Sequence, residues 1–270
     1  MTQPLDLARA LAVLPVPLPP GRLVGADADD PEPLLWISDA PATPGLWAQL
    51  HRAHPETGLW PLLLEPLEAG PEFRPWLSGE LDPGYASEPD LYDPAALLRT
   101  WWEGGGEDDD EGYRDESEHA DALAPYGPAW PGAAPAVVVP DGAADAEARG
   151  LADVLQSVKE VRLGLIPARS GAHALAVCGW GGPLNHEGDT GKIAAVLADW
   201  ERRFGAQVVE VGFDTLQLSV PVPPATLADA LPVAAEHTAF CPDLVLQGTG
   251  TLTAYAEQLV GSHQWSFWWD

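Results

Sequence analysis

The feature that restricts the fold of this chain most is a long stripe of apolar residues with helical spacing. Two runs in which apolar and other residues alternate, as in strands, follow it. The stripe recurs at i, i+3, i+4, i+7 and i+11: Ile193, Val196, Leu197, Trp200 and Phe204. This spacing puts all five side chains on one face of a helix. Asp189 or Thr190 can cap the start of that helix, and Gly205 stands where helices commonly end in a left-handed residue.

The residues after this helix alternate between apolar and other side chains over 208–213 and 216–220. In the first run Val209, Val211 and Phe213 share one parity, and Glu210 has the other. The dipeptide Asp214–Thr215 separates the two runs. The pattern predicts a β-hairpin with one buried face.

Shorter signals predict the remaining elements. Apolar runs over 34–38, 59–64 and 161–167 are typical of strands, and 46–54, 95–103 and 252–260 read as helices. Thr226 and Asp229 resemble a capping box at the start of another helix, which Pro232 should bend or end early. The predicted fold class is α+β, with an antiparallel or mixed sheet and helices packed on one face.

Charge and proline divide the chain into three predicted regions. Residues 1–102 form a Pro-rich α/β region, 103–135 an acidic linker, and 136–270 a C-terminal α+β domain that folds independently from about residue 155. The segment Glu103–Asp121 carries ten carboxylates against Arg114 alone, so like charges repel and we expect a disordered loop. Calcium binding by Asp108 and its neighbours is the alternative, although the spacing of a calcium loop is missing.

The overall charge excludes two classes of partner. The 270 residues include 41 acidic and 13 basic side chains, a net charge of −28. Binding to nucleic acid or to an anionic membrane requires Lys and Arg, so we expect neither. No apolar run reaches the roughly 20 residues of a membrane span, and the N-terminal stretch lacks a basic leader. Two cysteines define no disulfide framework, so we expect a cytoplasmic protein.

One cluster of chemically active residue types is Glu236–His237 followed by Cys241 and Asp243. His, Cys and Asp together can bind zinc or form a nucleophile, base and orienting group. Glu236 is expected to point away from the apolar stripe that His237 borders. We favour the alternative of a buried cysteine beside a hydrogen-bonded helix-end histidine, and we predict no metal and no cofactor.

A second cluster lies in the loop Asn185–Asp189, where His186 can titrate near neutrality. Loops on rigid scaffolds often hold binding groups, and a helix N-terminus near Lys192 can hold an anion. The sequence contains no GxxxxGK[ST], GxSxG or HExxH motif. His186, His237, Cys241 and Asp243 are therefore the catalytic candidates of an enzyme hypothesis.

The end of the sequence is rich in aromatic residues. Trp265, Phe267 and Trp269 should share the buried face of a last strand, and Trp268 should lie on the other face. Tryptophan is common at interfaces as well as in cores. Asn185, Trp268 and Asp270 are therefore the predicted binding surface.

Several motifs occur in an order that resembles a known bacterial, mainly actinobacterial, family. They are GWGGPLN (179–185), AVLADWERRFGA (195–206), VGFDTLQLSV (211–220), PPATLADAL (223–231), AAEHTAFCPD (234–243) and WSFWWD (265–270). Over about residues 161–270 the chain resembles the domain-of-unknown-function 4253 family. The resemblance implies a domain of this size and no established reaction or catalytic residue.

Three functions remain open from the sequence. The first is a module that binds a basic protein, of the inhibitor or immunity type, because a strongly acidic protein attracts a positive partner. The second is a metal-dependent or hydrolytic enzyme that uses the candidates above. The third is a small-ligand binder with an aromatic pocket. The sequence makes no prediction of the oligomeric state.

Overall fold

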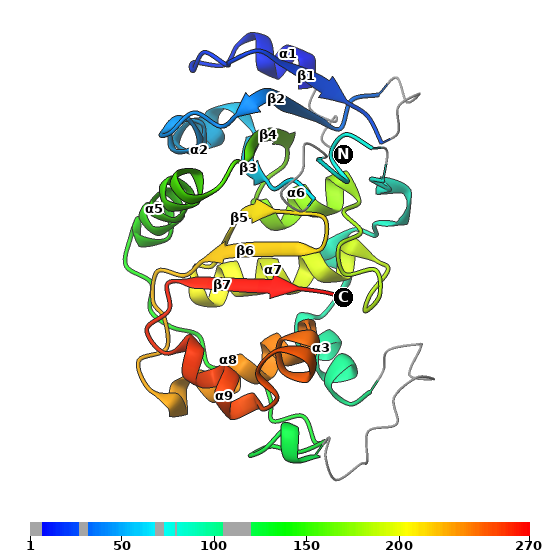
Figure 1. The fold of residues 1–270 in the computed structure, drawn as a ribbon, viewed down its shortest axis with the longest axis vertical. Coiled ribbons are helices and arrows are strands. Elements are labelled where there is room, and N and C mark those ends of the chain that lie inside the picture. Colours follow the sequence, from blue (N-terminus) through cyan, green and yellow to red (C-terminus); the bar gives the residue numbers. More distant parts are fainter. Residues whose placement is uncertain (1–6, 27–31, 68–72, 79, 105–119) are drawn as a thin grey trace.

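The fold is built on one mixed sheet. The computed structural model describes residues 7–26, 32–67, 73–78, 80–104 and 120–270. Their seven strands are ordered β1-β2-β4-β3-β5-β6-β7 (Figure 1). The strands are β1 (Gly21–Val24), β2 (Leu35–Pro41), β3 (Leu59–Leu64), β4 (Arg162–Pro167), β5 (Gln207–Val211), β6 (Thr215–Ser219) and β7 (Gln264–Trp268). Only β3 and β5 pair in parallel. The predicted α+β class with a mixed sheet is confirmed.

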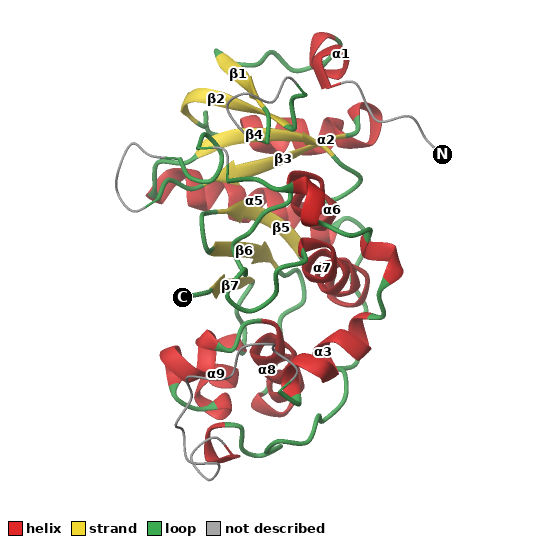
Figure 2. Ribbon diagram, turned by 90° about the vertical axis from the view of Figure 1, so that its right-hand side faces the viewer, coloured by secondary structure: helices red, strands yellow, loops and turns green. Residues whose placement is uncertain are grey.

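Helices cover both faces of this sheet. They are α1 (Leu7–Ala12), α2 (Leu46–Thr57), α3 (Pro94–Trp102), α5 (Ala143–Val158), α6 (Gly171–Cys178), α7 (Thr190–Phe204), α8 (Leu227–Phe240) and α9 (Leu252–Leu259). The sequence predicted one covered face. Instead α2 and α5 pack on one face, and α6 and α7 pack on the other, with α3, α8 and α9 beyond them (Figure 2). The reason is that all six residues of β3 are buried, so both of its sides need cover.

The sheet joins the two ends of the sequence. Strand β4 lies between β2 and β3, so its only neighbours come from the first 64 residues. The regions predicted as 1–102 and 136–270 therefore contribute to one sheet. The predicted acidic loop falls mostly on residues 105–119, which lie outside the described residues. Leu123 and Ala134, also assigned to the linker, are buried in the main core.

A β-bulge in β5 changes which of its residues face the same way. The pairing with β6 shifts between Val208 and Glu210. Consequently Val209 packs with α2 and α5, whereas Val208 and Val211 pack on the opposite side. The predicted common face of Val209 and Val211 is wrong, because strict alternation assumes a regular strand. Glu210 is fully buried.

The helix signals near the C-terminal end are confirmed at their boundaries. Asp189 caps α7 by accepting a hydrogen bond from the Gly191 amide, and Gly205 ends it with φ 67°. Thr226 and Asp229 form the expected capping box of α8. Pro232 does not end α8, which continues to Phe240. None of the described helices is both long and apolar enough to cross a membrane.

Candidate functional site

Three segments that are distant in sequence meet where the chain ends. The Asn185 side chain donates a hydrogen bond to the Asp270 carbonyl oxygen at 2.7 Å, and the Asp270 amide donates to Asp243 Oδ2 at 3.1 Å. One strand away, the Trp269 amide donates to the Asp214 carbonyl oxygen at 3.1 Å. The segment before α7 and the C-terminal end therefore lie side by side (Figure 1). We call Asn185, Asp214, Asp243, Trp268 and Asp270 the rim.

The last strand presents one tryptophan outward from a fixed backbone. Trp265, Phe267 and Trp269 are buried, whereas Trp268 is 40 % exposed. The Trp268 carbonyl oxygen accepts from Cys241 Sγ at 2.9 Å, and Trp269 Nε1 donates to the Phe240 carbonyl oxygen at 3.3 Å. These bonds hold the Trp268 carbonyl group and the residue after it, and pairing with β6 holds Phe267 and Trp268. The exposed Trp268 ring is therefore carried by a fixed strand.

Negative charge gathers around Trp268. The pKa of Asp214 is raised by burial, a hydrogen bond with Trp268 opposes this effect, and the charges of Glu65 and Asp270 raise the pKa further. The two lysines of this region already have carboxylate partners. Lys159 bonds Glu65 at 2.9 Å, and Lys192 bonds Glu187 at 2.9 Å. The rim therefore has carboxylates available for a positive group.

His186 lies beside the rim and is half-buried. Its ring packs against Trp101 with centroids 5.3 Å apart. Burial lowers the pKa of His186, while the charges of Glu187 and Asp243 oppose that shift. The ring is therefore neutral at pH 7, and its buried Nε2 has no hydrogen-bond partner among the described residues.

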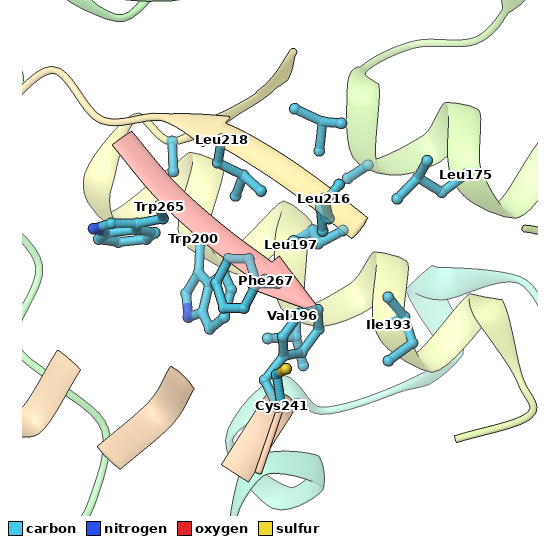
Figure 3. Packing of buried hydrophobic residues seen from close by; sticks show 14 of the residues in the cluster. Leu175, Ile193, Val196, Leu197, Trp200, Leu216, Leu218, Cys241, Trp265 and Phe267 are labelled. Atoms are coloured by element: carbon cyan, nitrogen blue, oxygen red, sulfur yellow. The ribbon is translucent and has the colours of Figure 1, made fainter. Parts of the chain in front are cut away.

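His237 and Cys241 are buried rather than accessible. His237 Nδ1 lies 2.9 Å from the Tyr255 hydroxyl, and burial lowers the pKa of His237 to about 3. Its ring packs among Trp200, Trp265 and Phe267. Burial likewise raises the pKa of Cys241 to about 12, and its side chain lies beside Val196 in the apolar cluster (Figure 3).

The catalytic candidates therefore do not gather around one reacting position. Asp243 belongs to the rim and His186 lies beside it, whereas the His237 ring is enclosed in the core by Trp200, Trp265 and Phe267. A thiol with a pKa of about 12 is protonated at neutral pH and is a poor nucleophile. Among the residues that the structure describes, no group of three or more His, Cys, Asp and Glu side chains is placed to hold a metal ion.

The comparisons with known proteins bear on the part of the chain that contains most of the rim. Residues 162–270 match one family model, described as Domain of unknown function (DUF4253). Over these residues the chain is similar to the DUF4253 family. The resemblance predicted from the sequence motifs is confirmed over these residues. No curated protein and no solved structure matches the chain.

The DUF4253 region comprises β4–β7 and α6–α9. Two fully buried acidic residues within it were missed by sequence reasoning. Glu236, expected to point outward, is fully buried between α7 and α8, where Arg203 and Trp200 Nε1 bond it. Glu210 is fully buried at the bulge and bonds Lys159 Nζ at 2.5 Å. The single signal for either was an acidic residue in an otherwise apolar run. Strand alternation assigned Glu210 to solvent, and helical position assigned Glu236 to solvent.

Proposed function

We propose that this protein is a protein-binding module that recognises a basic partner through the rim. One observation carries the proposal: Trp268 is exposed on a rigid strand among carboxylates, while the nearby lysines already have carboxylate partners. A lysine or arginine of the partner can then stack on the indole ring and pair with Asp214 or Asp270. Cation–π contacts of this kind contribute about 0.5–2 kcal/mol.

The charge of the whole chain supports the same function. A net charge of −28 creates a negative field that speeds encounter with a positive protein. Tryptophan is among the residues most often found at energetic centres of interfaces. A cytoplasmic location belongs to the same proposal and is supported by Cys178 and Cys241, which are both free thiols.

The geometry gives less support to the enzyme hypothesis and to the small-ligand hypothesis. An enzyme would need an accessible nucleophile or base, and His237 and Cys241 are buried. A small-ligand binder would need aromatic side chains around an opening, and Trp265, Phe267 and Trp269 instead fill the core against Trp200 and Phe240.

Photo-crosslinking from the rim tests the proposal. p-Benzoylphenylalanine placed at position 268 should cross-link a basic protein in cells of the source organism, identified by mass spectrometry. The partner should then be purified and its Kd measured at low and high salt. Trp268→Ala and Asp270→Asn should weaken binding, and added salt should weaken it further because exposed charge pairs are screened.

Val138 supplies the control position for this experiment. It is 91 % exposed and lies near the C-terminal end of α7, because Val137 bonds the Arg203 carbonyl oxygen. The rim lies near the other end of α7. Cross-links that are equal at positions 138 and 268, or a partner whose affinity is independent of salt, would contradict the proposal.

A further inference from the structure

Residues 82–93, which we call the strap, contain the same short turn twice. Asp82–Pro83–Gly84–Tyr85 and Glu88–Pro89–Asp90–Leu91 each place an acidic residue before a 3₁₀ turn that begins with proline. Each turn ends on a large side chain that faces solvent. Tyr85 is 77 % exposed and Leu91 is 74 % exposed. Folding therefore leaves both side chains largely outside the core.

The strap is fixed at several points along its length. The Asp82 amide donates to the Gly179 carbonyl oxygen at 3.0 Å. The Ser87 amide donates to Asp189 Oδ1 at 2.9 Å, and the Tyr92 hydroxyl donates to Asp189 Oδ2 at 2.7 Å. Asp189 thus caps α7 and holds the strap with the same carboxylate.

Two glycines let the strap lie directly on the helix ends. A Cβ at Gly179 would come within 2.0 Å of the Asp82 backbone, and a Cβ at Gly191 within 2.1 Å of the Ser87 carbonyl oxygen. Backbone packed this closely is not a loosely held loop. The backbone that carries Tyr85 and Leu91 is therefore held in place, which reduces the backbone entropy lost on binding.

The charge of the strap indicates the kind of surface that fits it. Asp82, Glu88, Asp90 and Asp93 are exposed around the two apolar tips, and Asp90 pairs with Arg169. An apolar anchor ringed by carboxylates complements an apolar pocket ringed by lysine and arginine. Asp189 bonds the strap, and Asn185, four residues before it, bonds Asp270, so one short segment joins the strap to the rim.

We propose that the strap is the docking surface that determines which basic protein is bound, with Tyr85 and Leu91 entering two apolar pockets of a folded partner. This inference rests on the proposed function, because it names the surface that supplies most of the specificity. The rim attracts and pairs with positive groups of the partner protein. The strap binds only a partner with two apolar pockets at the spacing of Tyr85 and Leu91.

The test uses the full chain with p-benzoylphenylalanine at position 85, alongside the chain carrying it at position 268. Both should cross-link the same basic protein. With that protein purified, Tyr85→Ser and Leu91→Ser should each raise Kd about 10- to 30-fold, as expected for interface anchors. Val138→Ser should leave Kd unchanged. Thermal melts of the serine variants should match the wild type, because these side chains contribute little to the core.

The outcomes separate the two proposals. If Tyr85→Ser and Leu91→Ser leave Kd unchanged while Trp268→Ala raises it, the strap inference is overturned and the proposed function stands. If position 85 cross-links the basic protein and position 268 does not, the strap is supported and the rim is not the contact. If neither position cross-links a basic protein, both proposals fail.

Discussion

Arg203 of α7 donates two hydrogen bonds, of 3.0 and 2.6 Å, to the carboxylate of Glu236 in α8. Trp200 Nε1 and the Ala134 amide donate to the same carboxylate at 2.7 and 2.6 Å. Glu236 is fully buried, so its charge depends on these four donors. Through the Ala134 amide, the part of the chain that follows the acidic segment Glu103–Asp121 also joins this hydrogen-bond network.

Substitution of Arg203 should therefore lower the unfolding free energy strongly. Arg203→Met keeps an apolar stem and leaves the Glu236 charge without its cation, which typically costs about 3–5 kcal/mol of unfolding free energy. Urea denaturation measures the loss. Arg202→Met is the matched control, because Arg202 is adjacent and its side chain is 70 % exposed. Its partner Asp199 is buried but keeps Arg203 as a second partner, so the expected change is below about 1 kcal/mol. If both variants lost the same unfolding free energy, the buried pair of Arg203 and Glu236 would contribute no more than a surface pair.

The close approach of the strap to α7 predicts opposite effects for two helical glycines. Gly191→Ala puts a methyl group against the Ser87 carbonyl oxygen and should destabilise the protein by about 1–3 kcal/mol. Gly150→Ala, in α5, meets nothing within 4 Å and should stabilise it by up to about 1 kcal/mol. Thermal melts measure whether each substitution raises or lowers the stability. Stabilisation by Gly191→Ala would show that the strap moves aside freely.

The two faces of β7 predict different consequences for its tryptophans. Trp265 packs edge-on against Trp200 and Phe204, so Trp265→Ala should cost about 3–5 kcal/mol. Trp268→Ala removes an exposed ring and should change stability by less than about 1 kcal/mol. Chemical denaturation of both variants is the measurement. A similar loss in both would remove Trp268 from the proposed binding surface.

Glu210 predicts a pH dependence of stability with a definite sign. Burial raises its pKa to about 7 from an ordinary value of 4.5, although Lys159 opposes the shift. Between these pH values the folded state holds a proton that the unfolded state releases. The resulting stability is fully present below pH 4.5 and is lost as pH rises through 7.

Glu210→Gln removes this proton equilibrium. The variant should gain stability relative to the wild type between pH 5 and 8, on the order of 1–3 kcal/mol. Other titrating groups, including Glu201 and His51, are common to both proteins and cancel in the comparison. Glu257→Gln, at an exposed position of α9, is the matched control for the chemical change itself. A constant difference across the pH range would place the Glu210 pKa near its ordinary value.

The sheet order predicts how an isolated fragment behaves. The sequence suggests that residues from about 155 fold alone, but a 136–270 fragment would leave β4 without either of its neighbours. Leu163 and Leu165 would then lose their packing against Leu59 and Leu63. We expect no cooperative melt for the fragment, and recovery on mixing with residues 1–135. A sharp transition of the fragment by itself would support the independent domain.

Local patterns predicted much of the fold and little of the site. Periodicity and caps located α7, α8 and β7, and alternation correctly separated Trp268 from Trp265. The 16-residue helix α5 was missed, because its small residues dilute the apolar stripe. The bulge at Val209 was invisible to a rule that assumes regular pleating. Asn185 and Asp270 are 85 positions apart, and their contact depends on the whole sheet.

The position of β4 also governs how the chain folds during synthesis. Strand β3 ends at Leu64, but its two neighbours begin at Arg162 and Gln207. At about 5–20 residues per second, a ribosome needs roughly 5–20 s to deliver the first of them. During that interval the apolar run of β3 has no strand partner. The chain made next includes the tract Glu103–Asp121 with its ten carboxylates. Because like charges repel, we expect this tract to oppose association of newly made chains until β4 is available.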